Sequence, residues 1–234
     1  MRSSKWSAHG NVYLLVELDD GGRLTPAEAA KLAAEHGTDG VLEVLAVSDA
    51  EAEIAIWNPD GSRAEMSGNG TRIAARWLSE RVDAAEVRIR VGERVVSARV
   101  AGDEVEQDLG PVEVGAPEVV GGVELVPVSV GNPHAVVIGD PAAIERLGPL
   151  LETHPRFPER TNVQVARVDE PGRVSARVWE RGVGETQSSG TSATAVAAAT
   201  HGDGDVVVEF PGGALRVRLK SGRAFVTGPA ERVD

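Results

Sequence analysis

Two Ser-Gly pairs, each preceded by a tryptophan at the same distance, are the first residues whose spacing suggests chemistry. Trp57 lies ten residues before Ser67, and Trp179 lies ten residues before Ser189. The two serines are 122 positions apart in a chain of 234 residues. In both copies an apolar run ends in tryptophan and is followed by a glycine-containing turn, Ser-Gly and a helix-like segment. The repeat therefore predicts a duplicated domain with two equivalent helix N-termini.

A helix N-terminus attracts anions because it carries about half a positive charge and N–H groups without partners in the helix. If the two halves face each other, both helix N-termini would stabilise one anionic group in the same cleft. The alternative is that each serine is simply an N-cap, a position that serine often occupies. The equal spacing of the two copies favours the anion-binding interpretation over two unrelated caps.

The chain contains no cysteine, which excludes disulfides, thiolate metal sites and a cysteine nucleophile. The histidines outside position 134 lack the spacing of metal ligands: His9, His36, His154 and His201. We therefore predict no metal. The segment Gly182-Val-Gly184 is too short for a dinucleotide-binding fingerprint, which also needs a strand–helix–strand context.

The charge balance excludes several classes of partner. With 24 basic and 36 acidic residues the formal net charge is −12, so neither a nucleic acid nor an anionic membrane surface is expected to bind. No apolar run reaches the roughly 18–20 residues of a membrane span, and the first residues lack the apolar core of a signal peptide. These features predict a cytoplasmic protein. Hydrophobic residues make up 41% of the chain, which is typical of a globular fold.

Short valine-rich runs dominate the chain and predict a mostly β structure with one long helix in each half. Thr25-Pro26-Ala27-Glu28 has the pattern of a capping box, and Gly37 is a typical C-terminal residue for the helix that follows. The predicted helices cover residues 27–36, 70–80, 141–151 and 191–200. The predicted strands cover residues 12–17, 41–46, 53–57, 86–91, 95–100, 123–130, 135–138, 163–168, 173–179, 206–210, 215–219 and 224–227.

This pattern favours an α+β fold over a parallel sheet of repeated βαβ units. Between residues 110 and 122 the composition shifts to glycine, proline and glutamate, which marks a boundary. We predict an N-terminal domain of residues 1–112, which the last residues, 228–234, could rejoin, and a C-terminal domain of residues 113–227.

Five motifs in order along the chain resemble diaminopimelate epimerase. They are Asn58-Pro-Asp-Gly61, Met66-Ser-Gly-Asn-Gly-Thr-Arg72, Gly131-Asn-Pro-His134, Phe157-Pro-Glu-Arg-Thr-Asn162, and Trp179-Glu-Arg-Gly-Val-Gly-Glu-Thr186 followed by Ser189-Gly-Thr191. The resemblance runs from about residue 5 to about residue 229. It implies an isomerase that needs no cofactor, inverts the α-carbon of diaminopimelate (LL to meso) and supplies lysine and cell-wall synthesis.

The same resemblance implies two pseudo-symmetric domains, each a β-barrel-like sheet wrapped round a central helix, with an amino-acid ligand between them. By motif position the implied ligand contacts are Asn11, Asn58, Asn132, Asn162 and Arg181. Gly68, Asn69, Gly190 and Thr191 correspond to the two helix N-termini that hold the α-carboxylate. His134 and Glu180 correspond to residues that tune proton transfer. Homodimers are common in such a family, and no residue pattern here decides that point.

The chain departs from the family where the chemistry is done. In the family the positions of Ser67 and Ser189 are cysteines, the acid and base on opposite faces of the α-carbon. Ile73 and Thr194 occupy neighbouring positions that often carry cysteine as well. Near the N-terminus Val12 stands where the family usually has an acidic residue. The side chain that recognises the far end of the ligand is therefore undefined.

Serine is a much weaker acid than cysteine, and each unit by which its pKa is higher adds about 1.36 kcal/mol to the free energy of deprotonation. A helix N-terminus stabilises the resulting negative charge by only about 0.3–2 kcal/mol. An unassisted serine is therefore a poor base. Three hypotheses follow. The chain is an epimerase with impaired or altered activity; or His134 or Glu180 supports an isomerase that acts on a different ligand; or the protein is a non-catalytic or divergent homologue that only binds an amino acid. Ser67 and Ser189 remain the predicted proton-transfer positions, with His134 and Glu180 beside them.

Overall fold

The computed structural model describes residues 1–233. The chain forms two compact units, one built from residues 1–107 and the last residues from 228 onward, the other from residues 108–227. It passes between them within β8 (Glu104–Pro111) and again close to the end of β18 (Arg223–Pro229). The assignment of two functional domains divided after residue 112 stays a prediction. Each unit is described by itself below.

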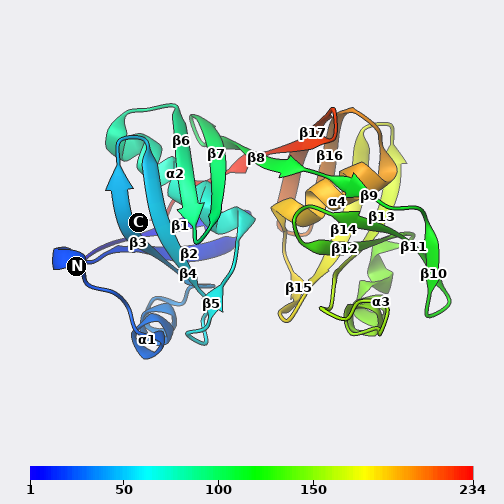
Figure 1. Ribbon diagram of the computed structural model, residues 1–234, viewed down its shortest axis with the longest axis horizontal. Helices are drawn as coiled ribbons and strands as arrows, with labels where there is room; N and C mark the ends of the chain where they lie inside the picture. Colours follow the sequence, from blue (N-terminus) through cyan, green and yellow to red (C-terminus); the bar gives the residue numbers. More distant parts are fainter. Residues whose placement is uncertain (234) are drawn as a thin grey trace. The chain divides into compact units, whose positions relative to one another are not determined.

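The first unit surrounds a central helix with strands (Figure 1). Its helices are a 3-10 turn at Asp19–Gly21, α1 (Pro26–His36) and α2 (Gly68–Val82). Its strands are β1 (Arg2–Ala8), β2 (Asn11–Glu17), β3 (Val41–Ser48), β4 (Glu51–Trp57), β5 (Arg63–Ala64), β6 (Glu86–Val91), β7 (Arg94–Ala101) and β19 (Glu231–Arg232). Strands β2 and β3 pair in parallel, as do β4 and β6, whereas β1–β2, β3–β4 and β6–β7 are antiparallel.

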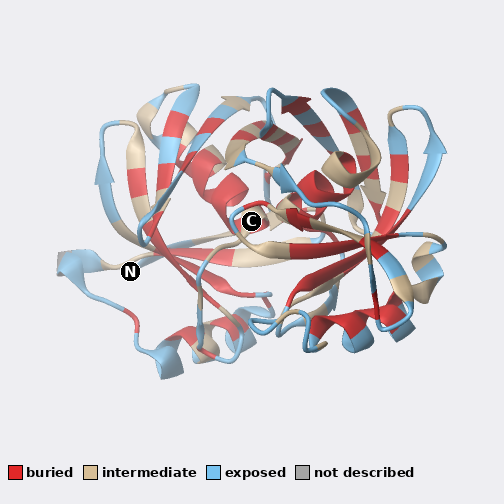
Figure 2. Ribbon diagram, turned by 45° about the vertical axis from the view of Figure 1, so that its right-hand side comes forward, coloured by how far each residue is buried: buried red, intermediate tan, exposed pale blue. Residues whose placement is uncertain are grey.

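Alternation along the strands gives this sheet two buried faces. Leu15 and Leu42 point to the core around α2, whereas Leu14 and Val41 point to a second core against α1. Successive side chains of a strand lie on opposite faces, so one sheet serves two helices. Figure 2 shows α2 as mainly buried, whereas much of α1 is exposed. Helix α2 is thereby held in place on several sides, which fixes the position of its N-terminus.

The capping signals that predict α1 are confirmed. The Thr25 side chain accepts a hydrogen bond from the Glu28 N–H at 3.3 Å, and the Glu28 carboxylate accepts one from the Thr25 N–H at 2.8 Å. Gly37 follows the helix with a φ of 60°, in the left-handed region that glycine adopts without strain. Local sequence therefore determines both ends of this helix.

The second unit repeats the arrangement with α4 (Gly190–Thr200) at its centre and α3 (Ile144–Glu152) on the other face of the sheet. Its strands are β9 (Glu113–Val114), β10 (Glu118–Val120), β11 (Val123–Ser129), β12 (Pro133–Ile138), β13 (Asn162–Glu170), β14 (Arg173–Glu180), β15 (Gly184–Thr186), β16 (Gly204–Phe210) and β17 (Gly213–Lys220). Parallel pairing recurs at β12–β13 and β14–β16. The fold is therefore α+β, with a mixed sheet and two repeated halves.

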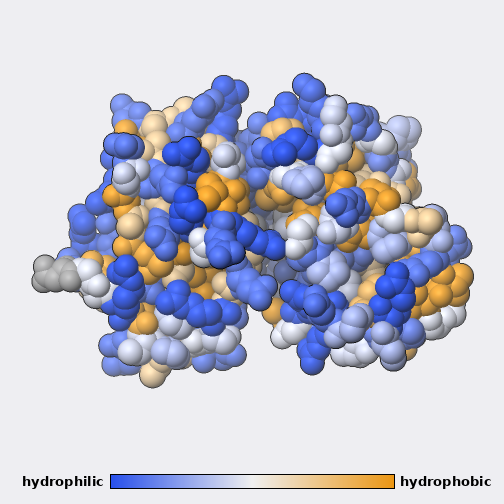
Figure 3. Space-filling model, in the orientation of Figure 1, coloured by the Kyte–Doolittle hydropathy of each residue, from blue (hydrophilic) through white to orange (hydrophobic). Residues whose placement is uncertain are grey.

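The predicted helix over residues 141–151 is wrong in its first turn. Pro141–Ala143 form a 3-10 turn, and the α-helix begins only at Ile144 and continues to Glu152. The Asp140 side chain accepts a hydrogen bond from the Ala142 N–H, which stabilises the tighter turn. Sequence analysis also missed β1 and β8, whose polar residues hide the alternating pattern. Figure 3 shows hydrophilic residues interspersed with small hydrophobic patches on the visible surface.

Candidate functional site

The first candidate group lies at the N-terminus of α2, where Ser67 is the N-cap. Its side-chain oxygen accepts a hydrogen bond from the Gly70 N–H at 3.0 Å. A Cβ at position 70 would lie 3.3 Å from the Ser67 side chain and 3.0 Å from Leu42, so only glycine fits without displacement. The Tyr13 hydroxyl from β2 lies 3.2 Å from the Ser67 oxygen. Two hydrogen-bonding groups therefore converge on Ser67.

The two residues after Ser67 form the first turn of α2. Gly68 is half-buried, and Asn69 is 6% exposed. The first N–H groups of any helix have no acceptor within the helix, so this turn offers backbone donors. The Asn69 side-chain oxygen accepts a hydrogen bond from Arg72 at 2.5 Å. The orientation of the Asn69 amide group is thus fixed by Arg72, which lies about one turn further along the helix.

The other two predicted contacts of the first unit lie at the ends of strands. Asn11 begins β2, and its amide nitrogen is buried without a hydrogen-bond partner within the described part of the chain. Asn58 follows β4 and closes a turn, with its amide nitrogen donating to the Ser62 hydroxyl at 2.9 Å. A buried donor without a partner costs about 1–3 kcal/mol. Asn11 is therefore the stronger of the two as a ligand contact.

The second candidate group lies at the N-terminus of α4. Ser189 has nearly the same backbone conformation as Ser67, with φ −150° and ψ 130° against −143° and 120°. It differs because its side chain makes no capping hydrogen bond to the helix; its hydroxyl lies 3.4 Å from that of Thr191. Ser189 is 8% exposed, and Gly190 is buried. The two helix N-termini thus have nearly the same backbone conformation but different hydrogen bonds.

His134 is the centre of a buried hydrogen-bonded chain in the second unit. Its Nε2 lies 3.0 Å from the Asn132 side-chain oxygen, and its Nδ1 lies 2.9 Å from the Gln164 amide nitrogen. The Gln164 nitrogen also donates to Ser192 at 3.0 Å. Burial, with a smaller effect of the Arg181 charge, lowers the pKa of His134 to about 3. The imidazole is therefore neutral at pH 7, with Nε2 as donor and Nδ1 as acceptor, and neither nitrogen is available to deprotonate a serine.

A third group joins Asn162 to the loop after β14. Parallel pairing of β12 and β13 places Asn162 beside His134. The Asn162 amide donates to the Pro133 carbonyl at 3.0 Å and accepts from the Arg181 N–H at 3.0 Å. Burial raises the pKa of Glu180, whose carboxylate accepts a hydrogen bond from the Thr186 hydroxyl at 2.5 Å. The second unit therefore brings Asn132, His134 and Asn162 together with the Arg181 backbone.

The order of elements in the two halves points to one residue that sequence analysis missed. Asn11 and Asn132 are 121 positions apart; Asn11 is the first residue of β2, and Asn132 immediately precedes β12. By the same offset Tyr13 corresponds to His134, and by the tryptophan offset of 122 Asn58 corresponds to Glu180. Tyr13 is the only tyrosine of the chain. Extending the 121–122 periodicity to β2 is the signal that would have identified it.

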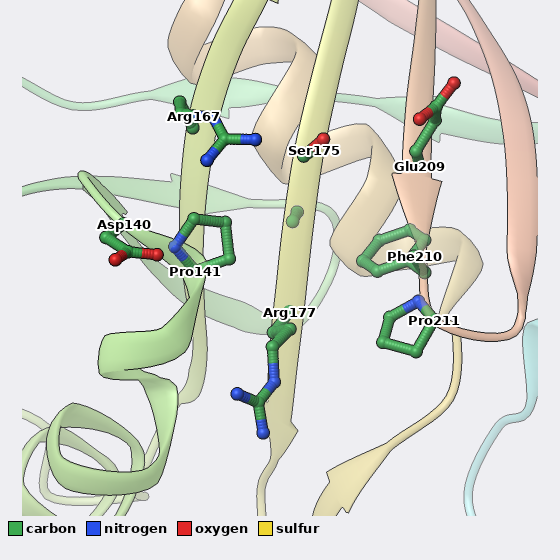
Figure 4. Close-up of a pocket in the computed structure, with 9 residues that line it drawn as sticks. Asp140, Pro141, Arg167, Ser175, Arg177, Glu209, Phe210 and Pro211 are labelled. Carbon is green, nitrogen blue, oxygen red and sulfur yellow. The ribbon is translucent and has the colours of Figure 1, made fainter.

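Among the side chains that the structure describes, no three His, Cys, Asp or Glu are grouped so that they could hold a metal ion. None of the helices described is both long and apolar enough to span a membrane. A pocket in the second unit, with a volume of about 330 Å³, involves none of the predicted site residues (Figure 4). Its arginines already pair with carboxylates, Arg167 with Asp169 at 2.8 Å and Arg177 with Glu185 at 2.6 Å. It therefore offers no unpaired cation to a ligand.

Known proteins resemble the chain over almost its whole length. The diaminopimelate epimerase family model matches residues 3–115 and 126–233. A diaminopimelate epimerase of Synechococcus elongatus is 36% identical over 269 aligned residues, which cover 100% of this chain and 96% of that protein. That of Desulforudis audaxviator is 38% identical over 229 residues, covering 84% of this chain and 82% of the relative.

Solved structures show the same fold at lower sequence identity. A predicted epimerase of Pseudomonas aeruginosa has a TM-score of 0.75 at 18% identity, covering 100% of this chain and 97% of that one. A hydroxyproline epimerase of Agrobacterium vitis, solved with bound trans-4-hydroxy-L-proline, has a TM-score of 0.66 at 16% identity, covering 98% and 88%. Given the family match over both halves and the full-length relatives, the chain belongs to the diaminopimelate epimerase family.

Proposed function

We propose that the protein is a cofactor-independent amino-acid epimerase of the diaminopimelate type, slowed by serine at both proton-transfer positions. One observation carries the proposal: the two halves place serines with matching backbone conformations immediately before central helices. In this proposal the amides of Gly68, Asn69, Gly190 and Thr191 bind one α-carboxylate. The negative charge that develops on the ligand as the α-proton leaves is then stabilised by donors fixed in advance.

Epimerisation needs one group that removes the α-proton and another that returns a proton on the opposite face. We assign these roles to Ser67 and Ser189. Hydrogen bonds to the charged form lower a pKa, and Ser67 receives one from Gly70, with the Tyr13 hydroxyl also in reach. Their effect is small against the several pKa units that separate serine from cysteine, so slow turnover is expected.

The remaining site residues bind and orient in this proposal. Asn11 has an amide donor without a partner, which suits a carboxylate or carbonyl oxygen of the ligand. Neutral His134 fixes the Asn132 side-chain oxygen, which leaves the Asn132 amide hydrogens for the ligand. Glu180 and Arg181 follow one another at the end of β14, and in this proposal they supply an acidic and a basic group to a zwitterionic ligand. No residue at either helix N-terminus has to hold a cofactor for this chemistry.

The cysteine-free composition favours a second candidate, a protein that binds an amino acid without turning it over. Both candidates use the same amides and asparagines, and they differ only in proton transfer. A third possibility is exchange on a different amino acid, since the chain does not define the group that recognises the ligand's far end.

Deuterium incorporation separates these candidates. The protein is incubated in D₂O with LL- or meso-diaminopimelate, and the α-proton signal is followed by NMR. The proposal predicts slow, enzyme-dependent loss of that signal, abolished in Ser67→Ala and Ser189→Ala and unchanged in Ser97→Ala, an exposed serine on β7. A ligand-induced rise in melting temperature without exchange would support binding alone. Exchange with other amino acids but not with diaminopimelate would show that the substrate is a different amino acid.

A further inference from the structure

Helix α2 contains a buried cation to which the proposed chemistry assigns no role. Arg72 is 0% exposed. One terminal nitrogen donates to the Asn69 side-chain oxygen at 2.5 Å. The other, NH1, and the Nε atom have no hydrogen-bond partner within residues 1–233. A guanidinium normally uses its five donors in full when buried, so this arrangement is unusual.

The charge of Arg72 is poorly compensated. The acidic group that attracts the Arg72 charge is Glu104 on β8, and this side chain is only half-buried. Burial lowers the pKa of Arg72 to about 10, so the side chain stays protonated at pH 7. Buried charges without good partners are costly, and apolar residues of similar volume often replace them with no loss of stability. A role in packing alone therefore does not explain an arginine here.

The direction of the side chain connects this charge to the candidate site. Side chains of a helix point back toward its N-terminus. The bond from Arg72 to Asn69 shows that the guanidinium reaches the first turn of α2. Its charge therefore adds to the positive end of the helix dipole, close to Ser67. At this N-terminus a buried and incompletely partnered cation reinforces the ordinary attraction for anions.

The second unit lacks this feature. Position 194 lies 122 residues after position 72 and holds Thr194, which is buried and donates to the Gly190 carbonyl at 3.1 Å. Helix α4 itself contains no charged residue, and the nearest one before it in sequence, Glu185, pairs with Arg177 at 2.6 Å. The two helix N-termini thus have similar backbones but different electrostatic surroundings.

We propose that Arg72 is a positioning residue that fixes Asn69 and favours a negative charge at position 67 over one at position 189. The inference rests on the proposed function only in assigning these two positions to proton transfer. In that reaction, the unequal surroundings make position 67 the resting base and position 189 the resting acid. The proton moves from the α-carbon to the group at 67 and a second proton from the group at 189 to the opposite face, so charge and protons balance.

The absence of cysteine allows a direct test, because Ser67→Cys and Ser189→Cys each introduce a single thiol. The pH dependence of the alkylation rate by iodoacetamide gives the thiol pKa. A charge about 8 Å away in a medium of effective dielectric constant about 20 shifts a pKa by about 1.5 units. Adding Arg72→Met to Ser67→Cys should therefore raise the thiol pKa by about one to two units, whereas Arg72→Lys should leave most of the effect. In Ser189→Cys, Arg72→Met should leave the thiol pKa unchanged.

The thiol measurement needs no substrate, so its result is independent of whether the chain turns over diaminopimelate. Tyr13 faces position 67 and Glu104 faces Arg72, and both are kept in every variant. Equal shifts at the two thiols, or no shift at position 67, would overturn the proposal. If Arg72→Met fails to fold, the two single-cysteine proteins with Arg72 intact still decide it. The thiol pKa at position 67 should be the lower of the two, and equal or reversed values would contradict the inference.

Discussion

Replacing both Ser67 and Ser189 with cysteine is expected to raise the rate of α-proton exchange from diaminopimelate by about 10²–10⁴-fold. This is the range that a well-placed general acid or base contributes. A thiol has a reference pKa near 8.5 and is lowered further at a helix N-terminus, so a usable fraction is thiolate at pH 7. Initial rates of deuterium incorporation, measured at saturating ligand for the parent and the double variant, provide the comparison.

Single variants provide the control for this experiment. Because the two groups act on opposite faces of the α-carbon, Ser67→Cys and Ser189→Cys should each speed up exchange from only one of the two configurations. Ser97→Cys adds a thiol on the exposed face of β7 and should change nothing. A double variant that binds diaminopimelate with parent affinity and still shows no exchange would disprove the assignment of positions 67 and 189.

Acidification is expected to destabilise the protein through His134 by about 2 kcal/mol between pH 7 and pH 5. Its folded pKa, about 3, lies below the unfolded value near 6.5. Below pH 6.5 His134 binds a proton in the unfolded chain but stays neutral in the folded one. The free energy of unfolding therefore falls as the pH falls. The loss continues until about pH 3. Above pH 6.5 this contribution is fully present.

Urea unfolding at pH 7 and at pH 5 tests this prediction when the parent is compared with His134→Gln. Glutamine keeps one donor and one acceptor for Asn132 and Gln164 but cannot take up a proton in this range. All carboxylates and the other histidines are common to both proteins. The parent should therefore lose about 2 kcal/mol more than the variant. Equal losses would show that His134 is not buried in its neutral form.

Local signals were sufficient to predict much of the fold. The capping box at Thr25 and Glu28 fixes the start of α1, and Gly37 fixes its end. The repeated Trp and Ser-Gly spacing indicated where both central helices begin: they were predicted to start at residues 70 and 191, and they start at Gly68 and Gly190. Residues close in sequence determine these features, so they can be predicted from a single sequence. The 3-10 turn before α3 escaped prediction because Pro141 suits the first turn of either helix type.

Less of the candidate site was visible in advance, because it depends on contacts between distant strands. The parallel register of β12 and β13 places His134 beside Asn162 and its side chain against Gln164. No local pattern encodes that register. Tyr13 contacts Ser67 from 54 positions away, and the partnerless donors of Arg72 follow from the burial of the first two turns of α2. Sequence analysis therefore identified residue types and motif positions but not the protonation state of His134 or the partners of each side chain.

The central claim is that one carboxylate binds at both helix N-termini, and backbone amide NMR tests it most directly. Titration of the parent protein with diaminopimelate should shift the amide resonances of Gly68, Asn69, Gly190 and Thr191 together, with a single dissociation constant. Alaninamide, which lacks the carboxylate, should leave all four in place. Shifts confined to one helix N-terminus, or two different dissociation constants, would contradict the claim that a single ligand group joins the two halves.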